Sequence, residues 1–253
     1  MGRIIAIANQ KGGVGKTTTS VNLSASLASL GKKTLIIDID PQGNASSGVG
    51  INKGDIDVCI YDVLIDEEPI ENVIVPTKVD KLFIVPATIS LAGAEIELVS
   101  AISREVRLKN ALSHIKDEYD YILIDCPPSL GLLTLNALSA ADGVIIPVQC
   151  EYYALEGLSQ LLSTIRLVQK HLNKQLLIDG VLLTMLDART NLGLQVIEEV
   201  KKYFREKVYK SIIPRNVRLS EAPSHGKPII TYDERSRGAE TYLELAREVI
   251  KNG

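Results

Sequence analysis

Cysteine is scarce in this 253-residue chain, with only Cys59, Cys126 and Cys150 present. An odd number of cysteines at wide spacing, without a C-x-x-C pair, excludes a disulfide framework and a cysteine-based zinc site. We interpret the three thiols as small buried side chains in a reducing cytoplasm.

Histidine is equally scarce, and His114, His171 and His225 are scattered along the chain. No G-x-S-x-G motif occurs either, so a serine-hydrolase triad is excluded and the histidines are interpreted as structural or surface residues. Intrinsic disorder is excluded as well, because 45% of the residues are hydrophobic and only 23% are charged.

Long hydrophobic runs are absent too. The longest uncharged stretch, 126–141, contains two prolines and is shorter than the ~20 apolar residues that a membrane span requires. The apolar run at the N-terminus is too short for a signal peptide, and Ala6 breaks the myristoylation pattern. We therefore expect a cytoplasmic protein with no membrane anchor.

Short β-branched runs alternate with longer segments of helical period. The expected strands are 3–8, 33–38, 81–86, 121–125, 143–149, 176–183 and 209–213. The expected helices are 17–30, 94–116, 155–171, 192–206 and 240–251. Near-continuous apolar strands that alternate with helices predict an α/β fold, with a mostly parallel sheet covered by helices on both faces. With no repeat or linker in the sequence, one domain over residues 1–253 is expected.

A glycine-rich segment follows the first expected strand and precedes the first expected helix. It reads K-G-G-x-G-K-T, a specialised P-loop, in which glycines let backbone N–H groups converge on phosphate oxygens at a helix N-terminus. Lys16 is expected to reach the β- and γ-phosphates, and the Thr17 hydroxyl to ligate Mg²⁺. The residues expected at the nucleotide are Lys11, Gly12, Gly13, Val14, Gly15, Lys16, Thr17 and Thr18.

Three aspartates stand at the ends of two other expected strands. Asp38 and Asp40 lie at the C-terminal end of the second strand, and Asp125 ends the strand at 121–125. Strand-end aspartates often only cap turns. Beside a P-loop, at the sheet edge where ligands of open α/β sheets bind, they predict a Mg-nucleotide site.

At these residues the chain resembles the deviant Walker A ATPases of the ParA/MinD group, and within it the small chromosomal partition proteins. The resemblance covers nearly the whole chain. Its most specific segments are 11–18, 38–43, 125–129 and 214–223.

The resemblance implies a role for each site residue. Lys11 is the signature lysine that reaches the nucleotide of a second protomer, so that two ATP molecules are sandwiched in a face-to-face homodimer. Asp40 orients the attacking water and, with Lys11 and Lys16, completes the catalytic set.

Around the nucleotide, the resemblance assigns Asp125 to the Mg²⁺ shell together with Thr17. Asp38 helps to order that shell. Pro214 and Asn216 belong to a loop against the adenine.

Charge is unevenly distributed along the chain. The formal net charge is −3, but residues 1–163 carry −8 and residues 164–218 carry +6. Such basic residues are usually a solvated face. The family binds double-stranded DNA nonspecifically as a dimer, and this resemblance makes the basic segment a DNA-binding surface in a nucleoid-associated protein. The residues expected there are Arg189, Arg218, Lys201, Lys202 and Arg205.

The resemblance further implies a ParB-type DNA-binding partner that stimulates slow ATP hydrolysis. It also implies a role in chromosome partition, with additional control of replication initiation or sporulation-type transcription.

Two alternative functions stay open. One is a MinD-like membrane ATPase for division-site placement, which would need a basic amphipathic helix after residue 253. The other is a reductase of the nitrogenase-iron-protein type, which would need two positioned cysteines per subunit.

Overall fold

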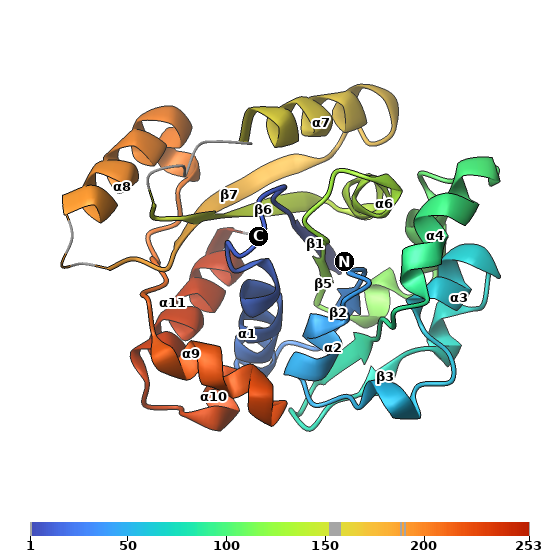
Figure 1. The fold of residues 1–253 in the computed structure, drawn as a ribbon, viewed down its shortest axis with the longest axis horizontal. Coiled ribbons are helices and arrows are strands. Elements are labelled where there is room, and N and C mark those ends of the chain that lie inside the picture. The colour runs from blue at the N-terminus through green and yellow to red at the C-terminus, as the bar shows by residue number, and fades with distance from the viewer. Residues whose placement is uncertain (1, 152–157, 188, 190, 253) are drawn as a thin grey trace.

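The computed structural model describes residues 2–151, 158–187, 189 and 191–252. Within these residues, seven strands form one sheet in the order β3-β4-β2-β5-β1-β6-β7 (Figure 1). All pairings are parallel except that of β3 with β4. The strands are β1 (Arg3–Ile7), β2 (Thr34–Asp38), β3 (Val75–Pro76), β4 (Leu82–Val85), β5 (Tyr121–Asp125), β6 (Gly143–Gln149) and β7 (Leu177–Thr184). The expected fold class is confirmed.

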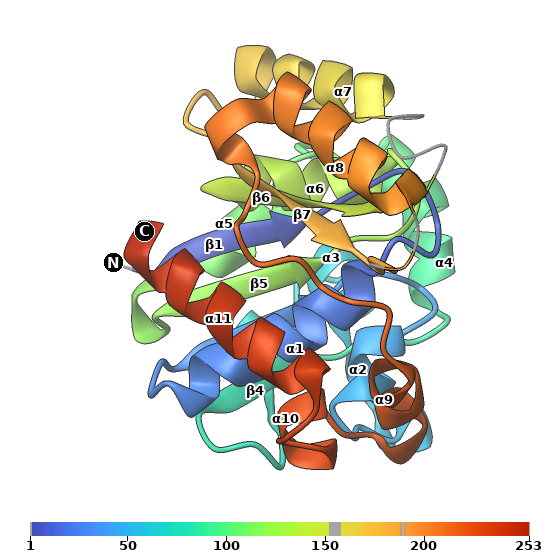
Figure 2. The ribbon, with the colours of Figure 1, turned by 90° about the vertical axis from the view of Figure 1, so that its left-hand side faces the viewer.

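Helices cover both faces of the sheet (Figures 1 and 2). The longer ones are α1 (Lys16–Ser29), α6 (Leu132–Ala140), α7 (Leu158–His171), α8 (Asn191–Phe204) and α11 (Arg237–Asn252). The shorter ones are α2 (Asn44–Gly48), α3 (Ile60–Ile65), α4 (Leu91–Glu97), α5 (Arg107–Ser113), α9 (Val217–Glu221) and α10 (Ile229–Tyr232).

Two apolar layers follow from the alternating side chains of the central strands. Ile5 and Ile7 of β1 pack with residues of α1 and α11, whereas Ile4 and Ala6 pack with residues of α3 to α8. Tyr242 of α11 is 1% exposed, and its hydroxyl lies 3.3 Å from that of Thr19. Helix α11 is therefore an integral part of one face of the sheet.

Two predicted elements differ from the structure, and one observed strand was not predicted. Segment 209–213 is not a strand, because it makes only separate hydrogen bonds with the edge of β7, through the N–H groups of Tyr209 and Ile213. Segment 94–116 is not one helix but α4, a 3-10 turn at Leu98–Ser100, and α5, with Ser103 at φ +54° between them. The antiparallel β3 was not predicted, since two residues carry no periodic signal. Residues 155–157 of the predicted helix 155–171 lie outside the described residues.

Within the described part of the chain, no helix combines the length and apolar character needed to cross a membrane.

Candidate functional site: a Mg-nucleotide site at the carboxyl edge of the sheet

The P-loop joins β1 to α1 at the carboxyl edge of the sheet. Gly13 and Gly15 have φ values of +72° and +88°, which L-residues with side chains adopt only under strain. Asn9 fixes the start of the loop, because its Oδ1 accepts from Lys11 N–H at 3.0 Å and its Nδ2 donates to Pro147 O at 2.7 Å. The loop is thus held in a curved conformation that presents N–H groups at the N-terminus of α1, as an anion site requires.

Lys16 begins α1 and turns its side chain back into the loop. The residue is 6% exposed, and its Nζ donates to Lys11 O at 3.1 Å. Burial lowers the pKa of Lys16, while Asp125, Cys126 and Asp40 act in the opposite direction. The Lys16 ammonium is therefore already positioned near the carboxylates of Asp125 and Asp40. A phosphate bound there would contact both the loop and the N-terminus of α1.

Asp38 and Asp125 are neighbours in register on the adjacent strands β2 and β5. Asp38 accepts from the backbone N–H and hydroxyl of Ser46, both at 2.8 Å, and from Asp40 N–H at 3.2 Å. Asp125 Oδ1 accepts from the Ser20 hydroxyl at 2.8 Å. Both carboxyl groups are fully buried.

The second oxygen of Asp125, Oδ2, is buried with no hydrogen-bond partner among the described residues. A buried carboxylate oxygen normally has a partner, so this one points to a missing ligand. The Thr17 side chain also lies close enough to Asp125 to lower the pKa of that carboxyl. Hard oxygen donors of this kind suit Mg²⁺, and Asp125 with Thr17 would hold it beside the phosphates.

Burial raises the pKa of Asp125 to about 8 and that of Asp38 to about 6, and the charge of each neighbouring aspartate adds to the effect. The folded, metal-free site therefore keeps protons that the unfolded chain, with carboxyl pKa values near 3.8, has released. This contribution to stability is complete below about pH 4 and is lost as the pH rises through the folded pKa values.

We therefore expect the stability of the metal-free protein to fall between about pH 4 and pH 8. Mg²⁺ with ADP should raise the melting temperature more at pH 8 than at pH 6, because at pH 8 fewer protons must leave before the metal binds. Thermal denaturation at several pH values measures this, and Asp125→Asn is the control that should weaken the pH dependence. A stabilisation by Mg-ADP that is equal at both pH values would contradict the prediction.

Asp40 lies in the loop after β2. It is 7% exposed, and its Oδ1 accepts from Gln42 N–H at 2.9 Å. Gly43 follows at φ +58°, where an added Cβ would come within 2.6 Å of Ala87 O, so glycine is required at this turn. The turn holds the Asp40 carboxylate close enough to Lys16 to raise the pKa of the lysine, against the effect of burial.

A cavity of about 690 Å³ opens beside the P-loop. Its lining includes Gly15 and Thr18 from the loop side, Thr184 and Met185 after β7, and Pro214 and Asn216 from the segment before α9. The Thr184 hydroxyl donates to Val14 O at 2.8 Å, which ties the P-loop to β7. A purine and ribose would fit here, next to the phosphate-binding loop.

The structure thus brings together every predicted nucleotide residue: the loop 11–18, the three aspartates, and Pro214 with Asn216. Three contributing residues were missed from the sequence. Ser20 lies four residues after Lys16 on α1, so the two side chains share one face of the helix. This spacing could have indicated that Ser20 also faces the site. Thr184 carries no sequence signal, because its contact with Val14 joins elements far apart in the chain. Ser46 carries none either, because its contact with Asp38 depends on the turn between β2 and α2.

The predicted DNA-binding residues fall into two groups. Arg189 and Arg218 stand on adjoining segments, since Leu186 is hydrogen-bonded to Ile213 and Arg215 at 3.1 and 3.0 Å. Both guanidinium groups are exposed, and each is paired with an acid, Arg189 with Asp187 and Arg218 with Glu221.

The second group, Lys201, Lys202 and Arg205, lies at or just beyond the far end of α8. At 1.5 Å per helical residue, this end is about 15 Å from the start of the helix next to Arg189. The five residues therefore do not form one compact cluster.

The cysteines also occupy separate places. Cys59 lies near Thr88 and Ser90, Cys126 follows Asp125, and the Cys150 backbone N–H donates to Thr184 O. All three are buried. Burial raises the pKa of the Cys126 thiol, so it is an inert side chain of the site.

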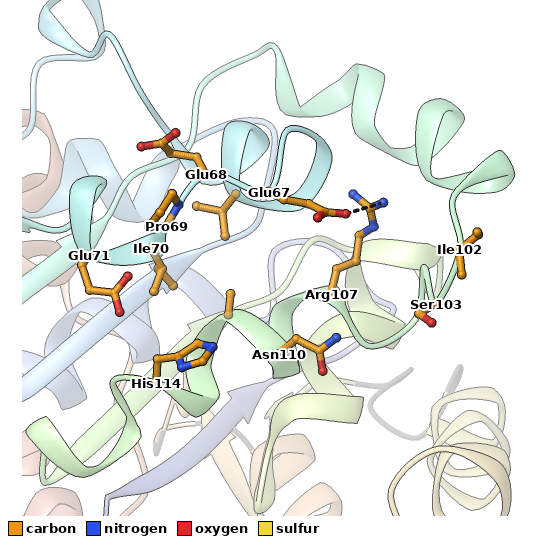
Figure 3. Close-up of a pocket in the computed structure, with 12 residues that line it drawn as sticks. Glu67, Glu68, Pro69, Ile70, Glu71, Ile102, Ser103, Arg107, Asn110 and His114 are labelled. Atoms are coloured by element: carbon orange, nitrogen blue, oxygen red, sulfur yellow. Dashed lines mark ion pairs between the residues drawn. The ribbon is translucent and has the colours of Figure 1, made fainter.

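A second cavity, of about 740 Å³, lies between α3 and α5 (Figure 3). Arg107 pairs there with Glu67 at 3.2 Å, and Glu68 and Glu71 lie along the same rim. None of its lining residues belongs to the P-loop, to the aspartates or to segment 213–223. It is therefore distinct from the nucleotide site.

Comparison with known proteins supports the geometry. Residues 2–178 match the family model described as an AAA domain. The chain is 74% identical, over all 253 residues of both chains, to the sporulation initiation inhibitor protein Soj of Bacillus subtilis. It is 60% identical to the chromosome partitioning protein ParA of Myxococcus xanthus, covering 99% of this chain and 89% of the relative.

Among solved structures, cobyrinic acid a,c-diamide synthase from Mycobacterium smegmatis with bound ADP and magnesium superposes with a TM-score of 0.88. It is 37% identical, with 99% of this chain and 95% of that chain covered. The fold is therefore shared with a structure that holds ADP and magnesium.

Proposed function

The chain belongs to the ParA/Soj family of chromosome-partitioning P-loop ATPases, and from this premise we propose that it works as an ATP-dependent switch on DNA. Its cofactor is Mg-ATP, and it hydrolyses ATP. In the proposed cycle, Mg-ATP draws two copies together face to face, and the dimer holds double-stranded DNA without sequence preference. Slow hydrolysis to ADP and phosphate, stimulated by a ParB-type partner, releases the DNA.

One observation supports the face-to-face dimer in this proposal. Lys16 and the three aspartates are buried, whereas Gly12 and Gly13 of the same loop are exposed at the carboxyl edge of the sheet. A Cβ built on Gly12 meets no atom within 4 Å. The loop is therefore open to solvent at Gly12 and Gly13, where a second copy could place its own P-loop and Lys11.

The test combines oligomeric state and DNA binding. Mass and DNA retention are measured with ATP, with ADP and without nucleotide, for the wild type and for Asp40→Ala. The proposal requires that the protein dimerises and retains DNA only with ATP. In Asp40→Ala, both the dimer and the DNA complex should last longer than in the wild type. Equal DNA retention in all three nucleotide states would refute the switch, and ATP-dependent liposome binding without DNA binding would favour the MinD-like alternative.

Gly12→Val should separate ATP binding from dimerisation. Because the space around Gly12 is open and its φ is not in the left-handed region, the monomer should fold and bind ATP normally. The added side chain would project from the exposed loop and obstruct a close dimer. Equilibrium sedimentation should show a monomer with ATP where the wild type dimerises; a normal ATP dimer would count against a P-loop interface.

Arg189→Ala with Arg218→Ala should weaken DNA binding and its salt dependence. A dimer loses four guanidinium groups, and if each contacts one phosphate, the slope of log K against log salt should fall by about 3–4. The matched control is Arg237→Ala with Arg247→Ala, two exposed arginines on α11. Unchanged ATP-dependent DNA retention in the first variant would place the DNA surface elsewhere, with Lys201, Lys202 and Arg205 as the next candidates.

A further inference from the structure

Helix α4 and the 3-10 turn that follows it have an apolar side facing the core. Leu91, Ala94 and Leu98 are 0% exposed and belong to the larger of the apolar layers. Hydrogen bonds from Leu91 N to Thr88 O and from Ala92 N to Ile89 O extend the helical turn back to residue 89. This buried side is enough to hold the segment on the sheet.

The opposite side of the same segment is apolar as well. Ile89, Ile96 and Val99 are 71%, 77% and 59% exposed, and Ala92 between them is also exposed. Their spacing of 3, 4 and 3 residues places them on one stripe of the helix. We call Ile89, Ala92, Ile96 and Val99 the α4 stripe.

Single exposed aliphatic residues are common on protein surfaces, but a contiguous set marks an interaction site. A helix that is apolar on two opposite sides is normally covered on both. The α4 stripe is therefore a surface that another molecule covers.

The stripe lies at the same end of the sheet as the nucleotide site. β4 ends at Val85 on the carboxyl edge and leads directly into it, and α4 lies toward the P-loop end of the strands (Figures 1 and 2). Glu95 of α4 packs on the loop that follows Asp125, since a Cβ on Gly131 would meet Glu95 Oε1 at 2.1 Å. The α4 stripe thus belongs to the same carboxyl end of the sheet that also exposes Gly12 and Gly13.

Charge restricts what covers the stripe. Residues 89–105 contain Glu95, Glu97 and Glu105 and one basic residue, Arg104, which is bonded to Glu105 at 2.9 Å and to Val99 O. DNA phosphates and anionic lipid headgroups would be repelled by these carboxylates. The occupant is therefore a protein surface.

We propose that the α4 stripe is covered by a second copy of this chain in the ATP-bound dimer, an inference that rests on the proposed function. A stable interface buries about 800 Å² on each partner and has an apolar core. The P-loop edge presents mainly glycine backbone and polar groups, and the α4 stripe at the same end of the sheet supplies the apolar area that it lacks. The stripe is exposed in the single chain because the partner is absent.

The test uses Asp40→Ala as a background in which hydrolysis does not interfere. Ile96→Asn with Val99→Asn should weaken its ATP-dependent dimer on the order of 100-fold, since two-fold symmetry introduces each change twice. Both side chains are mostly exposed, so folding and ATP binding by the monomer should be unaffected. The matched control is Leu167→Asn on α7, where a leucine is 60% exposed.

Sedimentation of the purified protein with ATP separates the outcomes. If the Asp40→Ala background itself stays monomeric, the proposed function fails and this inference fails with it. If the background dimerises and the stripe variant dimerises equally well, the inference alone is overturned. A loss of partner-stimulated hydrolysis in that variant would then assign the stripe to another protein.

An environment-sensitive dye gives an independent readout. The native thiols of Cys59, Cys126 and Cys150 are buried, so a dye on Ile96→Cys reports on the α4 stripe. In the Asp40→Ala background its emission should shift to the blue with ATP, and the shift should reverse on dilution. An ATP-induced shift that is independent of protein concentration would indicate a change within one chain and would overturn the inference.

Discussion

Replacing Lys16 by alanine should lower the affinity for ATP by about 1000-fold, which corresponds to about 4 kcal/mol. The side chain is 94% buried within the P-loop, where its ammonium lies close to Asp125 and Asp40. Without it, the β- and γ-phosphates would face those carboxylates with no countercharge from α1. Charge-assisted contacts to phosphate are among the strongest polar interactions in proteins, and water cannot replace the ammonium at the buried position of Lys16.

Titration with a fluorescent ATP analogue measures the loss. Lys109→Ala, an exposed lysine on α5, is the control for removal of one positive charge. Circular dichroism should show that the Lys16→Ala variant is folded. An affinity within threefold of the wild type would mean that Lys16 does not contact the phosphates.

Asp40→Ala should reduce ATP hydrolysis by about 100-fold or more, the range for removal of a positioned acid–base group, while ATP binding changes little. The carboxylate is 7% exposed in a loop whose Gln42 N–H holds one of its oxygens, so its position is preset before ATP arrives. Its loss removes the group proposed to orient the attacking water but no expected metal or phosphate contact.

Single-turnover hydrolysis with saturating Mg-ATP, together with the lifetime of the ATP dimer, tests this assignment. Asp57→Ala, an exposed aspartate in the same region of the chain, is the matched control. The hydrolysis rate should fall and the dimer should persist. Hydrolysis at the wild-type rate would show that another residue orients the water.

Much of the fold followed from local patterns. Most strands, such as 121–125 and 143–149, were predicted within a residue of their observed bounds, because buried parallel strands are continuous apolar runs. The predicted strand 209–213 was wrong because its apolar residues, such as Tyr209 and Ile213, serve the core beside α11 without pairing regularly with β7. The predicted helix 94–116 was wrong because its period continues through a turn at Ser103 that only packing imposes.

What the amino-acid sequence determined by itself is the chemistry of the phosphate site. The spacing of Lys11, Lys16 and Thr17 is a property of one continuous loop, so neighbouring residues suffice to specify it.

The tertiary structure alone decided which distant groups complete that site and what is left exposed. Ser20 becomes a partner of Asp125 only because parallel pairing sets β5 beside β1, the strand that leads into α1. Ser46 meets Asp38 through the turn from β2 into α2, and its hydroxyl also accepts from the distant Ala87 N–H. The two groups of basic residues lie apart because helix α8 (Asn191–Phe204) places Lys201, Lys202 and Arg205 at the end away from Arg189. The α4 stripe could not be predicted from the sequence, because only the packed core decides which apolar residues are buried and which stay exposed.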